Sequence, residues 1–379
     1  MKKATIITYG CAMNVNESAK IKKLLENMGY EVIDDISESD AVFLNTCTVR
    51  EGAATQIYGK LGELKTVKEK KKPNMIIGVT GCFAQEQGEE LASKFKQIDI
   101  VMGNQNIGKI PQAIENIESG DFKHVIYTGN EDELPPRIDA DFGDKHVASL
   151  PITYGCNNFC TYCIVPYVRG RERSVPLAQV VEEAREYLVE KKNKELLLIG
   201  QNVNSYGNDF DNGDNFAKLL TELCKIEGDF LIRFISPHPR DFTDEVIDVI
   251  ASNDKIGKAI HLPLQSGSTN VLKAMNRGYT KEEYIALANK IKEKIPGVSL
   301  TADIIVGFPG ETEEDFLDTL DVVDKVRFDN SFMFMYSIRT GTKAAEMTNQ
   351  IDEEVKKERL QRLIALQNKI AKENSVAYM

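Results

Sequence analysis

Three cysteines stand close together near the middle of the chain and form its most informative motif. The run 152–163 reads Ile-Thr-Tyr-Gly-Cys-Asn-Asn-Phe-Cys-Thr-Tyr-Cys and contains Cys156, Cys160 and Cys163. Three thiolates at this spacing can ligate three irons of a [4Fe–4S] cluster, which usually takes four cysteines. The fourth iron then has no protein ligand in the motif, so a small molecule can bind it. A structural zinc site is the alternative, but such sites usually take four ligands, often as two CxxC pairs, and no such pairs follow.

The CxxxCxxC spacing is the motif by which radical S-adenosylmethionine (SAM) enzymes are recognised, and the chain resembles them at these cysteines. The resemblance implies that the open iron binds the amine and carboxylate of SAM. It also implies that an electron from the cluster cleaves SAM to a 5′-deoxyadenosyl radical. The cofactor would therefore supply the difficult chemistry while the protein positions it.

Three further cysteines recur in similar contexts in the first third of the chain. Cys11, Cys47 and Cys82 each come just after an expected apolar strand, within Tyr-Gly-Cys, Asn-Thr-Cys and Thr-Gly-Cys. Because the carboxyl ends of neighbouring parallel strands meet at one edge of a sheet, these side chains could converge on one cofactor. Free cysteines also pack as small apolar residues. The seventh cysteine, Cys224, lies on the apolar stripe of an expected helix and fits that second interpretation.

The elements that must position these cysteines follow from the hydrophobic pattern. Residues 1–130 alternate short apolar runs with amphipathic segments, which predicts an N-terminal parallel α/β sheet domain. Strands are expected at 4–9, 41–45, 75–80 and 98–102, and helices at 16–28, 51–70, 85–95 and 111–117.

A second α/β series follows an acidic segment, 131–146, that contains Pro135-Pro136 and is the predicted linker. Six strands with intervening helices predict a partial (β/α)6 barrel over 147–351. The last segment, 352–379, is expected to begin with one charged amphipathic helix over 352–373. The barrel strands are expected at 148–153, 195–199, 230–235, 259–264, 299–306 and 331–335.

Composition limits the class of protein. A chain of 379 residues is long enough for two or three domains, each with its own core. No apolar stretch has the length of a signal peptide or a membrane span, so we expect a cytoplasmic protein without a membrane partner. Seven cysteines in such a chain indicate metal binding rather than disulfides.

The net charge of −11 argues against a protein that binds nucleic acid nonspecifically through global phosphate neutralisation. Two local basic stretches remain. The lysines of 65–72 fit a solvated helix end slightly better than a binding patch. The arginines of Arg169-Gly-Arg-Glu-Arg173 follow the CxxxCxxC motif directly, so we expect Arg169, Arg171 and Arg173 to contact substrate.

Taken together, the two cysteine sets make the whole chain resemble the radical SAM methylthiotransferases. The sequence around these cysteines resembles that of one branch of the family, the tRNA-2-methylthio-N6-isopentenyladenosine synthases. Ala12 stands where that branch commonly has glutamine. The similar segments are Gly10-Cys-Ala-Met-Asn14, Asn45-Thr-Cys-Thr-Val-Arg-Glu51 and 154–174. Two other branches, which modify threonylcarbamoyladenosine or an aspartate of a ribosomal protein, differ at the first cysteine and remain the alternatives.

The resemblance implies two [4Fe–4S] clusters, an auxiliary one on Cys11, Cys47 and Cys82 and a SAM-binding one on the CxxxCxxC motif. It implies transfer of a methylthio group to C2 of N6-isopentenyladenosine 37 in the anticodon stem-loop of tRNA. One SAM would donate the methyl group and another would supply the radical that abstracts the hydrogen at C2. An electron donor such as flavodoxin or ferredoxin is implied, and the sulfur source stays open. No catalytic residue is expected beyond the cluster ligands.

The resemblance also implies that a small β-barrel RNA-binding domain, the TRAM domain, would follow 352–379 and is absent here. From a different class, a noncatalytic iron–sulfur protein that binds RNA or carries electrons is the competing hypothesis. The open-iron motif and the expected barrel disfavour it.

Residues at strand ends and between the cluster cysteines are the candidates for contacts with SAM. Polar residues at such positions also cap helices, and aromatic ones also pack in cores, so these alternatives stay open. Arg50, directly after the Cys47 motif, is a further candidate for substrate contact, whereas His238 and His261 fit structural roles. The candidates for SAM binding are Phe159, Tyr162, Gln201, Asn202, Arg233, Ser236, Gln265 and Asp303.

Overall fold

The computed structural model describes residues 1–48, 53–129, 133–140 and 146–377. The chain divides into two compact units, each described here by itself. The first comprises Met1–Lys145 together with Tyr167–Arg171, and the second comprises His146–Pro166 and Glu172–Met379. None of the helices in the described part of the chain has both the length and the apolar character needed to cross a membrane.

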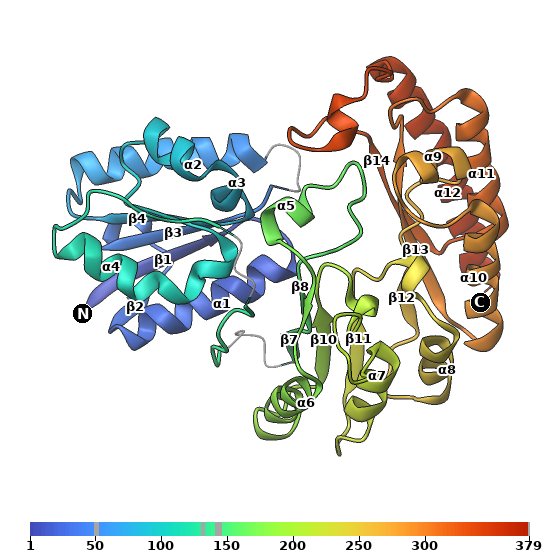
Figure 1. Cartoon of the computed structure of the whole chain (residues 1–379), viewed down its shortest axis with the longest axis horizontal. Coiled ribbons are helices and arrows are strands. Elements are labelled where there is room, and N and C mark those ends of the chain that lie inside the picture. The colour runs from blue at the N-terminus through green and yellow to red at the C-terminus, as the bar shows by residue number, and fades with distance from the viewer. Residues whose placement is uncertain (49–52, 130–132, 141–145, 378–379) are drawn as a thin grey trace. The chain divides into compact units, whose positions relative to one another are not determined.

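The first unit is built on a six-stranded, fully parallel sheet with helices on both faces (Figure 1). Helices α1 (Ala12–Asn27) and α4 (Ile110–Glu118) cover one face, and α2 (Ala53–Lys70) and α3 (Cys82–Lys94) cover the other. This confirms the predicted fold class. The strand order is β2 (Tyr30–Val32), β1 (Lys2–Thr8), β3 (Ala41–Thr46), β4 (Ile76–Gly81), β5 (Ile100–Met102) and β6 (Val125–Tyr127).

The two helical layers, one on each face of the sheet, follow from the alternation of side chains along the central strand β3. Phe43 points into a core with Ile21 of α1, whereas Leu44 points into a second core with Ile57 of α2. Successive residues of a strand face opposite sides of the sheet, so a strand covered on both sides must be apolar throughout. All six residues of β3 are buried. The short edge strands β2 and β6, three residues each, were not predicted because so few residues carry no clear pattern.

The second unit contains six parallel strands in two three-stranded sheets, β11-β10-β7 and β12-β13-β14. A bridge between Ile232 and Ile256 joins the end of the first sheet to the segment that leads into the second. Six such strands with helices between them agree with the predicted partial barrel. The strands are β7 (Val147–Pro151), β10 (Glu195–Ile199), β11 (Leu231–Phe234), β12 (Ala259–His261), β13 (Ser299–Val306) and β14 (Asn330–Met335).

Helices connect these strands on the outer side of the sheets (Figure 1). They are α6 (Leu177–Arg185), α7 (Phe216–Cys224), α8 (Asp244–Ser252), α9 (Thr269–Ala274), α10 (Lys281–Lys294) and α11 (Glu313–Val326). Helix α6 ends at Arg185, and the chain continues as a π-helix over Glu186–Glu190. Before α6, the chain forms a small antiparallel hairpin of β8 (Thr153–Tyr154) and β9 (Arg173–Ser174), with α5 (Val165–Arg169) between its strands.

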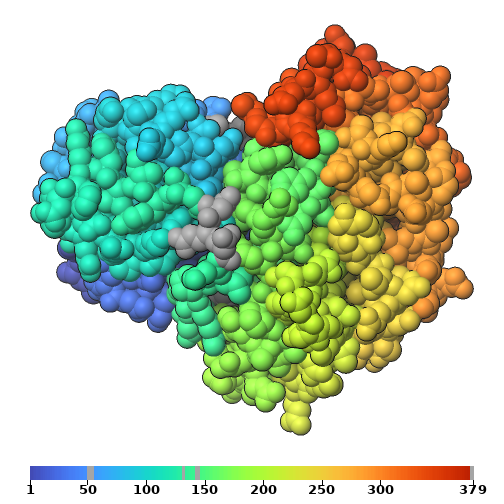
Figure 2. Space-filling view, viewed as in Figure 1, coloured from blue at the N-terminus to red at the C-terminus, as the bar shows by residue number. Residues whose placement is uncertain are grey.

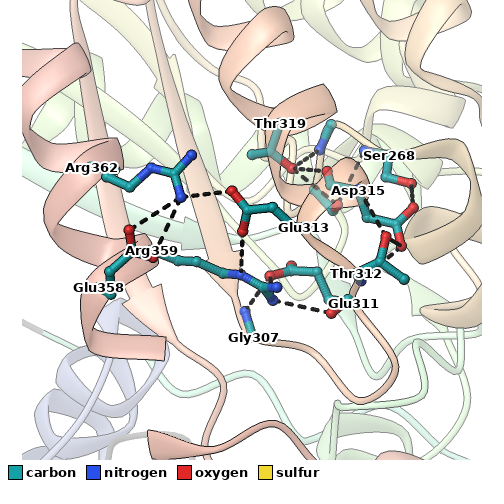
Figure 3. A network of polar contacts seen from close by, with 12 residues as sticks. Ser268, Gly307, Glu311, Thr312, Glu313, Asp315, Thr319, Glu358, Arg359 and Arg362 are labelled. Atoms are coloured by element: carbon teal, nitrogen blue, oxygen red, sulfur yellow. Dashed lines mark hydrogen bonds and ion pairs between the residues drawn. The ribbon is translucent and has the colours of Figure 1, made fainter. Parts of the chain in front are cut away.

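The C-terminal helix α12 (Glu353–Ala377) packs within the second unit and is held to the loop before α11 by a buried ion pair. Arg359 contacts Glu311 at 2.8 Å, and the other contacts of Glu311 include the amide of Gly307 (Figure 3). Arg362, one turn further along, pairs with Glu313 at the surface.

One segment of the predicted barrel region groups with the first unit, while the predicted boundaries at residues 130, 146 and 351 stay predictions. Tyr167–Arg171, which the sequence placed inside the barrel region, belongs to the first unit, so the chain returns to that unit after the CxxxCxxC motif. The start of the helix expected over 51–70 lies outside the described residues, which begin again at Ala53.

Candidate functional site

The first cysteine triad lies at the carboxyl edge of three adjacent parallel strands. Cys11, Cys47 and Cys82 follow β1, β3 and β4, and β3 pairs with both of its neighbours. Cys11 is the N-cap of α1 and Cys82 is the first residue of α3. Positive partial charge at a helix N-terminus favours a thiolate. The three strands are parallel neighbours, as predicted, while the convergence of the three side chains on one cofactor stays a prediction. Cys11 is exposed, whereas Cys47 and Cys82 are buried.

Glycines allow the loops of this triad to lie so close together. Gly81 has a φ of +94°, and a Cβ atom there would lie 2.2 Å from the carbonyl oxygen of Thr46. Gly10 has a φ of +147°, and its Cβ would lie 2.9 Å from the Cβ of Cys47. Both backbones thus require glycine because of a neighbouring loop as well as the left-handed conformation.

An arginine contacts the first triad. Arg169, a residue of the same unit, donates from Nε to the Sγ atom of Cys82 at 3.1 Å and from Nη1 to Glu17 at 2.8 Å. Burial raises the pKa of Cys82 to about 12, although the Arg169 charge acts in the opposite direction. Without a bound cation this side chain would be a neutral thiol, so ligation would have to displace its proton.

The second triad lies in the loop between β8 and α5, within the second unit. Cys156 and Cys160 are buried and Cys163 is partly buried. Burial raises the pKa of Cys156 to about 12 and that of Cys163 to about 11. The 3-10 helix Lys343–Glu346 packs on this loop, since the amide of Ala344 donates to the carbonyl oxygen of Thr161 at 2.8 Å. Figure 2 shows an orange-red segment of the second unit lying against a green segment of the same unit.

An arginine also contacts the second triad. Arg277 donates from Nη1 to the Sγ atom of Cys160 at 3.4 Å. Its Nε donates to the hydroxyl of Tyr279 and its Nη2 to the carbonyl oxygen of Pro263. These partners fix the guanidinium beside the sulfur atom.

The donor sets fit iron–sulfur clusters better than single metal ions. Among the described residues, no three His, Cys, Asp or Glu side chains come close enough together to hold one ion. In a four-iron cluster each thiolate ligates a different iron, so the sulfur atoms need no common centre. Each triad also has a buried arginine beside a sulfur atom, which suits an anionic group. In the first triad, Nη2 of Arg169 is buried without a hydrogen-bond partner in the described part of the chain.

The polar residues predicted to contact SAM mostly follow the carboxyl ends of the barrel strands, the edge at which such barrels carry their sites. Gln201 and Asn202 follow β10: Gln201 accepts from the amide of Gly155 at 2.6 Å, and Asn202 donates to Asp241. Ser236 follows β11, and Gln265 lies after β12.

Backbone strain marks three of the predicted residues. Phe159, Ser236 and Gln265 adopt φ values of 47°, 63° and 68°, in the left-handed region that non-glycine residues rarely occupy. Strained conformations of this kind are concentrated at functional sites. The geometry therefore favours these positions, and their contacts with SAM stay a prediction.

Three other predicted residues lie in different surroundings. Tyr162 packs against an apolar cluster that includes Met275 and Phe308, which favours the packing alternative. Arg233 lies within β11 rather than at its end, and pairs with Glu195 at the start of β10. Asp303 lies on β13 and contacts His261 at 3.3 Å.

The predicted substrate arginines also divide by environment. Arg171 is exposed and Arg173 is partly buried. Arg169 is only 4% exposed, so its surroundings favour contact with sulfur over contact with a tRNA phosphate. Arg50 lies outside the described residues.

Sequence reasoning missed Arg277, Glu17 and Glu172. Arg277 reaches Cys160 across 117 residues, and no local pattern reports such a contact. Glu17 could have been noticed, since it is a charged residue three positions after Asn14, on the face of α1 that is buried. Glu172 is 7% exposed, and burial raises its pKa to about 7.

Two family models match separate parts of the chain. Residues 150–323 match the model of the radical SAM superfamily, which implies a [4Fe–4S] cluster and SAM. Residues 3–103 match the model described as uncharacterized protein family UPF0004.

Curated relatives match nearly the whole chain. The chain is 72% identical over 378 residues to the tRNA-2-methylthio-N(6)-dimethylallyladenosine synthase of Fusobacterium nucleatum subsp. nucleatum, covering 100% of this chain and 86% of that protein. It is 49% identical to the protein of the same name from Thermoanaerobacter pseudethanolicus, covering 98% of this chain and 79% of that protein.

Solved structures show a similar fold at low sequence identity. The cobalamin-dependent SAM radical enzyme OxsB gives a TM-score of 0.64 at 14% identity, covering 97% of this chain and 56% of that chain. The radical SAM methyltransferase TsrM from Kitasatospora setae also gives 0.64 at 14% identity, covering 91% and 77%. At such identities the likeness shows the fold alone.

Proposed function

The chain belongs to the tRNA-2-methylthio-N(6)-dimethylallyladenosine synthases, and from that membership we propose that it adds a methylthio group to C2 of N6-isopentenyladenosine 37 in tRNA. The observation that carries the proposal is the pair of cysteine triads, one at the ends of three adjacent parallel strands of the first unit and the other in the single loop between β8 and α5. An aromatic C–H bond such as that at C2 has no useful acidity for a general base, so its removal calls for a hydrogen-abstracting radical.

In this proposal Cys156, Cys160 and Cys163 hold the cluster that binds SAM, and Cys11, Cys47 and Cys82 hold an auxiliary [4Fe–4S] cluster. When bound, SAM and the two clusters supply the radical, the methyl group and the sulfur. The chain's own residues hold the ligand loops in place: glycines let the loops of the first triad approach, and Arg277 fixes the sulfur of Cys160. Burial of Cys156 and Cys160 excludes water, which protects reactive intermediates.

The side chains on one face of the sheet β12-β13-β14 suit a substrate base that carries an apolar substituent. Ser331 of β14 bonds to Gln367 of α12, so the alternate residues Phe332 and Phe334 face away from that helix. These phenylalanines are 53% and 51% exposed. Their cross-strand neighbours are Asp303 and Ile305. Two aromatic rings suit an isopentenyl group, whereas Asp303 would repel the carboxylate of a threonylcarbamoyl group.

The partner in this proposal is the anticodon stem-loop of tRNA, with Arg50, Arg171 and Arg173 as contacts to its phosphates. The net charge of −11 means that such contacts must be local. A flavodoxin or a ferredoxin would supply electrons, and a substrate of this kind supports a cytoplasmic location.

Reconstituted protein, incubated anaerobically with SAM, a reductant and tRNA carrying isopentenyladenosine, provides the test. Nucleoside mass spectrometry should detect the 2-methylthio product, and chromatography should detect 5′-deoxyadenosine. Cys160→Ala should abolish both products. Cys47→Ala should retain 5′-deoxyadenosine formation and lose methylthiolation.

Cys224→Ala is the matched control, because this partly buried cysteine is the last residue of α7 and belongs to neither triad, so the replacement should leave both products unchanged. A wild-type protein that modifies threonylcarbamoyladenosine instead would place the chain in another branch. Complete lack of SAM cleavage in iron-loaded wild-type protein would favour a noncatalytic iron–sulfur protein.

A further inference from the structure

A buried polar network in the first unit joins two of the three auxiliary cysteines. The Sγ atom of Cys11 lies 3.4 Å from Oδ1 of Asn14, whose Nδ2 lies 3.5 Å from Glu17. Glu17 accepts from Arg169 at 2.8 Å, and Arg169 donates to Cys82 at 3.1 Å. The network therefore runs from the loop of Cys11 through the inner face of α1 to Cys82, which follows a strand two positions away in the sheet.

Two opposite charges are buried at the centre of this network. The side chains of Arg169 and Glu17 are 5% and 7% exposed. Burial of an ion pair is costly, and the pair often stabilises the fold less than apolar residues of the same size would. A stabilising role alone is therefore a weak explanation for these two charges beside a cysteine sulfur.

The unsatisfied atom of Arg169 shows where a further partner belongs. Nη2 is buried and has no hydrogen-bond partner in the described part of the chain, while Nε and Nη1 are both engaged. A buried donor without an acceptor is unfavourable, and more so when it is charged. Because Nε of the same planar guanidinium already contacts a cysteine sulfur, an acceptor near Nη2 would lie close to the group that the triad holds.

We propose that Arg169 is a positioning residue of the auxiliary cluster, donating hydrogen bonds to Cys82 and to an inorganic sulfur, and that Glu17 balances its charge. The inference rests on the proposed function and assigns Arg169 a role other than the predicted contact with substrate. Hydrogen bonds to the sulfur atoms and the net charge nearby set the reduction potential of an iron–sulfur cluster. Arg169 therefore raises the potential of the auxiliary cluster, and Glu17 lowers it.

The test uses the full-length chain with Cys156, Cys160 and Cys163 replaced by alanine, so that one cluster remains. Iron per chain, the EPR spectrum of the reduced cluster and its midpoint potential are measured after anaerobic reconstitution. The variants are Arg169→Gln, Arg169→Lys and Glu17→Gln. Lys68→Gln is the matched control, because Lys68 pairs with Asp99 in the same unit, at the start of the sheet strands.

The proposal predicts shifts of opposite sign. Arg169→Gln should lower the midpoint potential and change the EPR spectrum, and Glu17→Gln should raise the potential. Arg169→Lys keeps the positive charge but loses the planar guanidinium with its several N–H donors. The midpoint potential of the cluster in this variant should therefore lie between those in Arg169→Gln and the parent. Lys68→Gln should match the parent.

Opposite shifts cannot come from a general loss of stability, which would act in the same direction in both variants. If Arg169→Gln loads no iron, Glu17→Gln still decides the question through its own shift. Iron-loaded variants with the potential of the parent would overturn this proposal and leave the proposed function standing. A parent that binds no iron would instead remove the auxiliary cluster from the proposed function, and this inference with it.

Discussion

Arg277 donates from Nη1 to the Sγ atom of Cys160 at 3.4 Å, across 117 residues of sequence. Arg277 is 5% exposed, and the rest of its guanidinium is held by Tyr279 and Pro263. Arg169 stands in the same relation to Cys82 in the first unit. In each unit a buried arginine thus faces one cysteine of the triad. Its positive charge would compensate the negative charge of the thiolates in the proposed iron–sulfur clusters.

Replacement of Arg277 should therefore weaken SAM cleavage more than folding. Residues that contact metal ligands typically change metal affinity or activity by about 10- to 100-fold when removed. We expect Arg277→Gln to lower the rate of 5′-deoxyadenosine formation by about that factor, and Arg277→Lys to recover part of it. Rates are measured per iron bound, so that poor loading is separated from poor cleavage. An unchanged rate in fully loaded Arg277→Gln would contradict a role at the cluster.

The ion pair between Arg359 and Glu311 gives a prediction about stability. Both side chains are almost fully buried (Figure 3), so removal of the arginine leaves an unpaired carboxylate in the interior. We expect Arg359→Met to lower the free energy of unfolding by about 3–5 kcal/mol. Urea denaturation of the full chain measures the change.

Arg362→Met is the matched control, because Arg362 lies one turn away and its pair with Glu313 is exposed. It should cost less than about 1 kcal/mol. Adding Glu311→Gln to Arg359→Met should restore part of the loss, since the unpaired charge is then gone. Equal effects of the two arginine variants would show that burial of the pair is unimportant.

The fold and both triads could be predicted because their signals are local. CxxxCxxC lies within eight residues, and Cys11, Cys47 and Cys82 each follow an apolar strand that is recognisable from its own composition. The packing of Tyr167–Arg171 with the first unit could not be predicted, since a five-residue helix carries no sign of which core it joins.

The surroundings of the sulfur atoms could not be predicted from the sequence for a related reason. Arg169 was expected to contact substrate, because the sequence next to a cluster motif does not show whether an arginine there is buried or exposed. Its pairing with Glu17 joins residues 152 positions apart. Such contacts arise only when the chain folds.

Glu172 predicts a pH dependence of stability. Burial, together with the nearby Asp241 and Asp209, raises the pKa of this carboxyl from 4.5 to about 7, while Ser205 and Arg240 act in the opposite direction. The folded chain therefore holds a proton that the unfolded chain releases near pH 4.5. The unfolded state binds fewer protons in this range, so the free energy of unfolding should fall as the pH rises from 4.5 to 7.

Glu172→Gln should remove this contribution, which is about 3 kcal/mol for a shift of this size. Wild-type and variant should have similar stabilities at pH 4.5, and the variant should become the more stable of the two by pH 8. Urea denaturation at a series of pH values measures the difference. Glu346→Gln, at an exposed glutamate of the same unit, should leave the pH dependence unchanged. Parallel curves for wild-type and Glu172→Gln would contradict the prediction.

Phe334 provides a prediction about substrate specificity. Its ring is 51% exposed on the face of β14 that points away from α12, beside Phe332. If this face takes the isopentenyl group, Phe334→Ala should raise the KM for an anticodon stem-loop that carries isopentenyladenosine. Apolar area lost from such a contact corresponds to about a tenfold change. The rate of SAM cleavage without RNA should stay the same, because the cysteine triad of this unit is untouched.

Leu317→Ala is the matched control for the phenylalanine variant. Leu317 is 47% exposed on α11 in the same unit, so its loss removes a comparable exposed apolar side chain from a helix surface. Its KM for the stem-loop should equal that of the wild-type. A KM that rises equally in both variants would mean that the phenylalanines do not contact the substrate. A rise confined to Phe334→Ala would support the preference for an apolar N6 substituent over threonylcarbamoyladenosine.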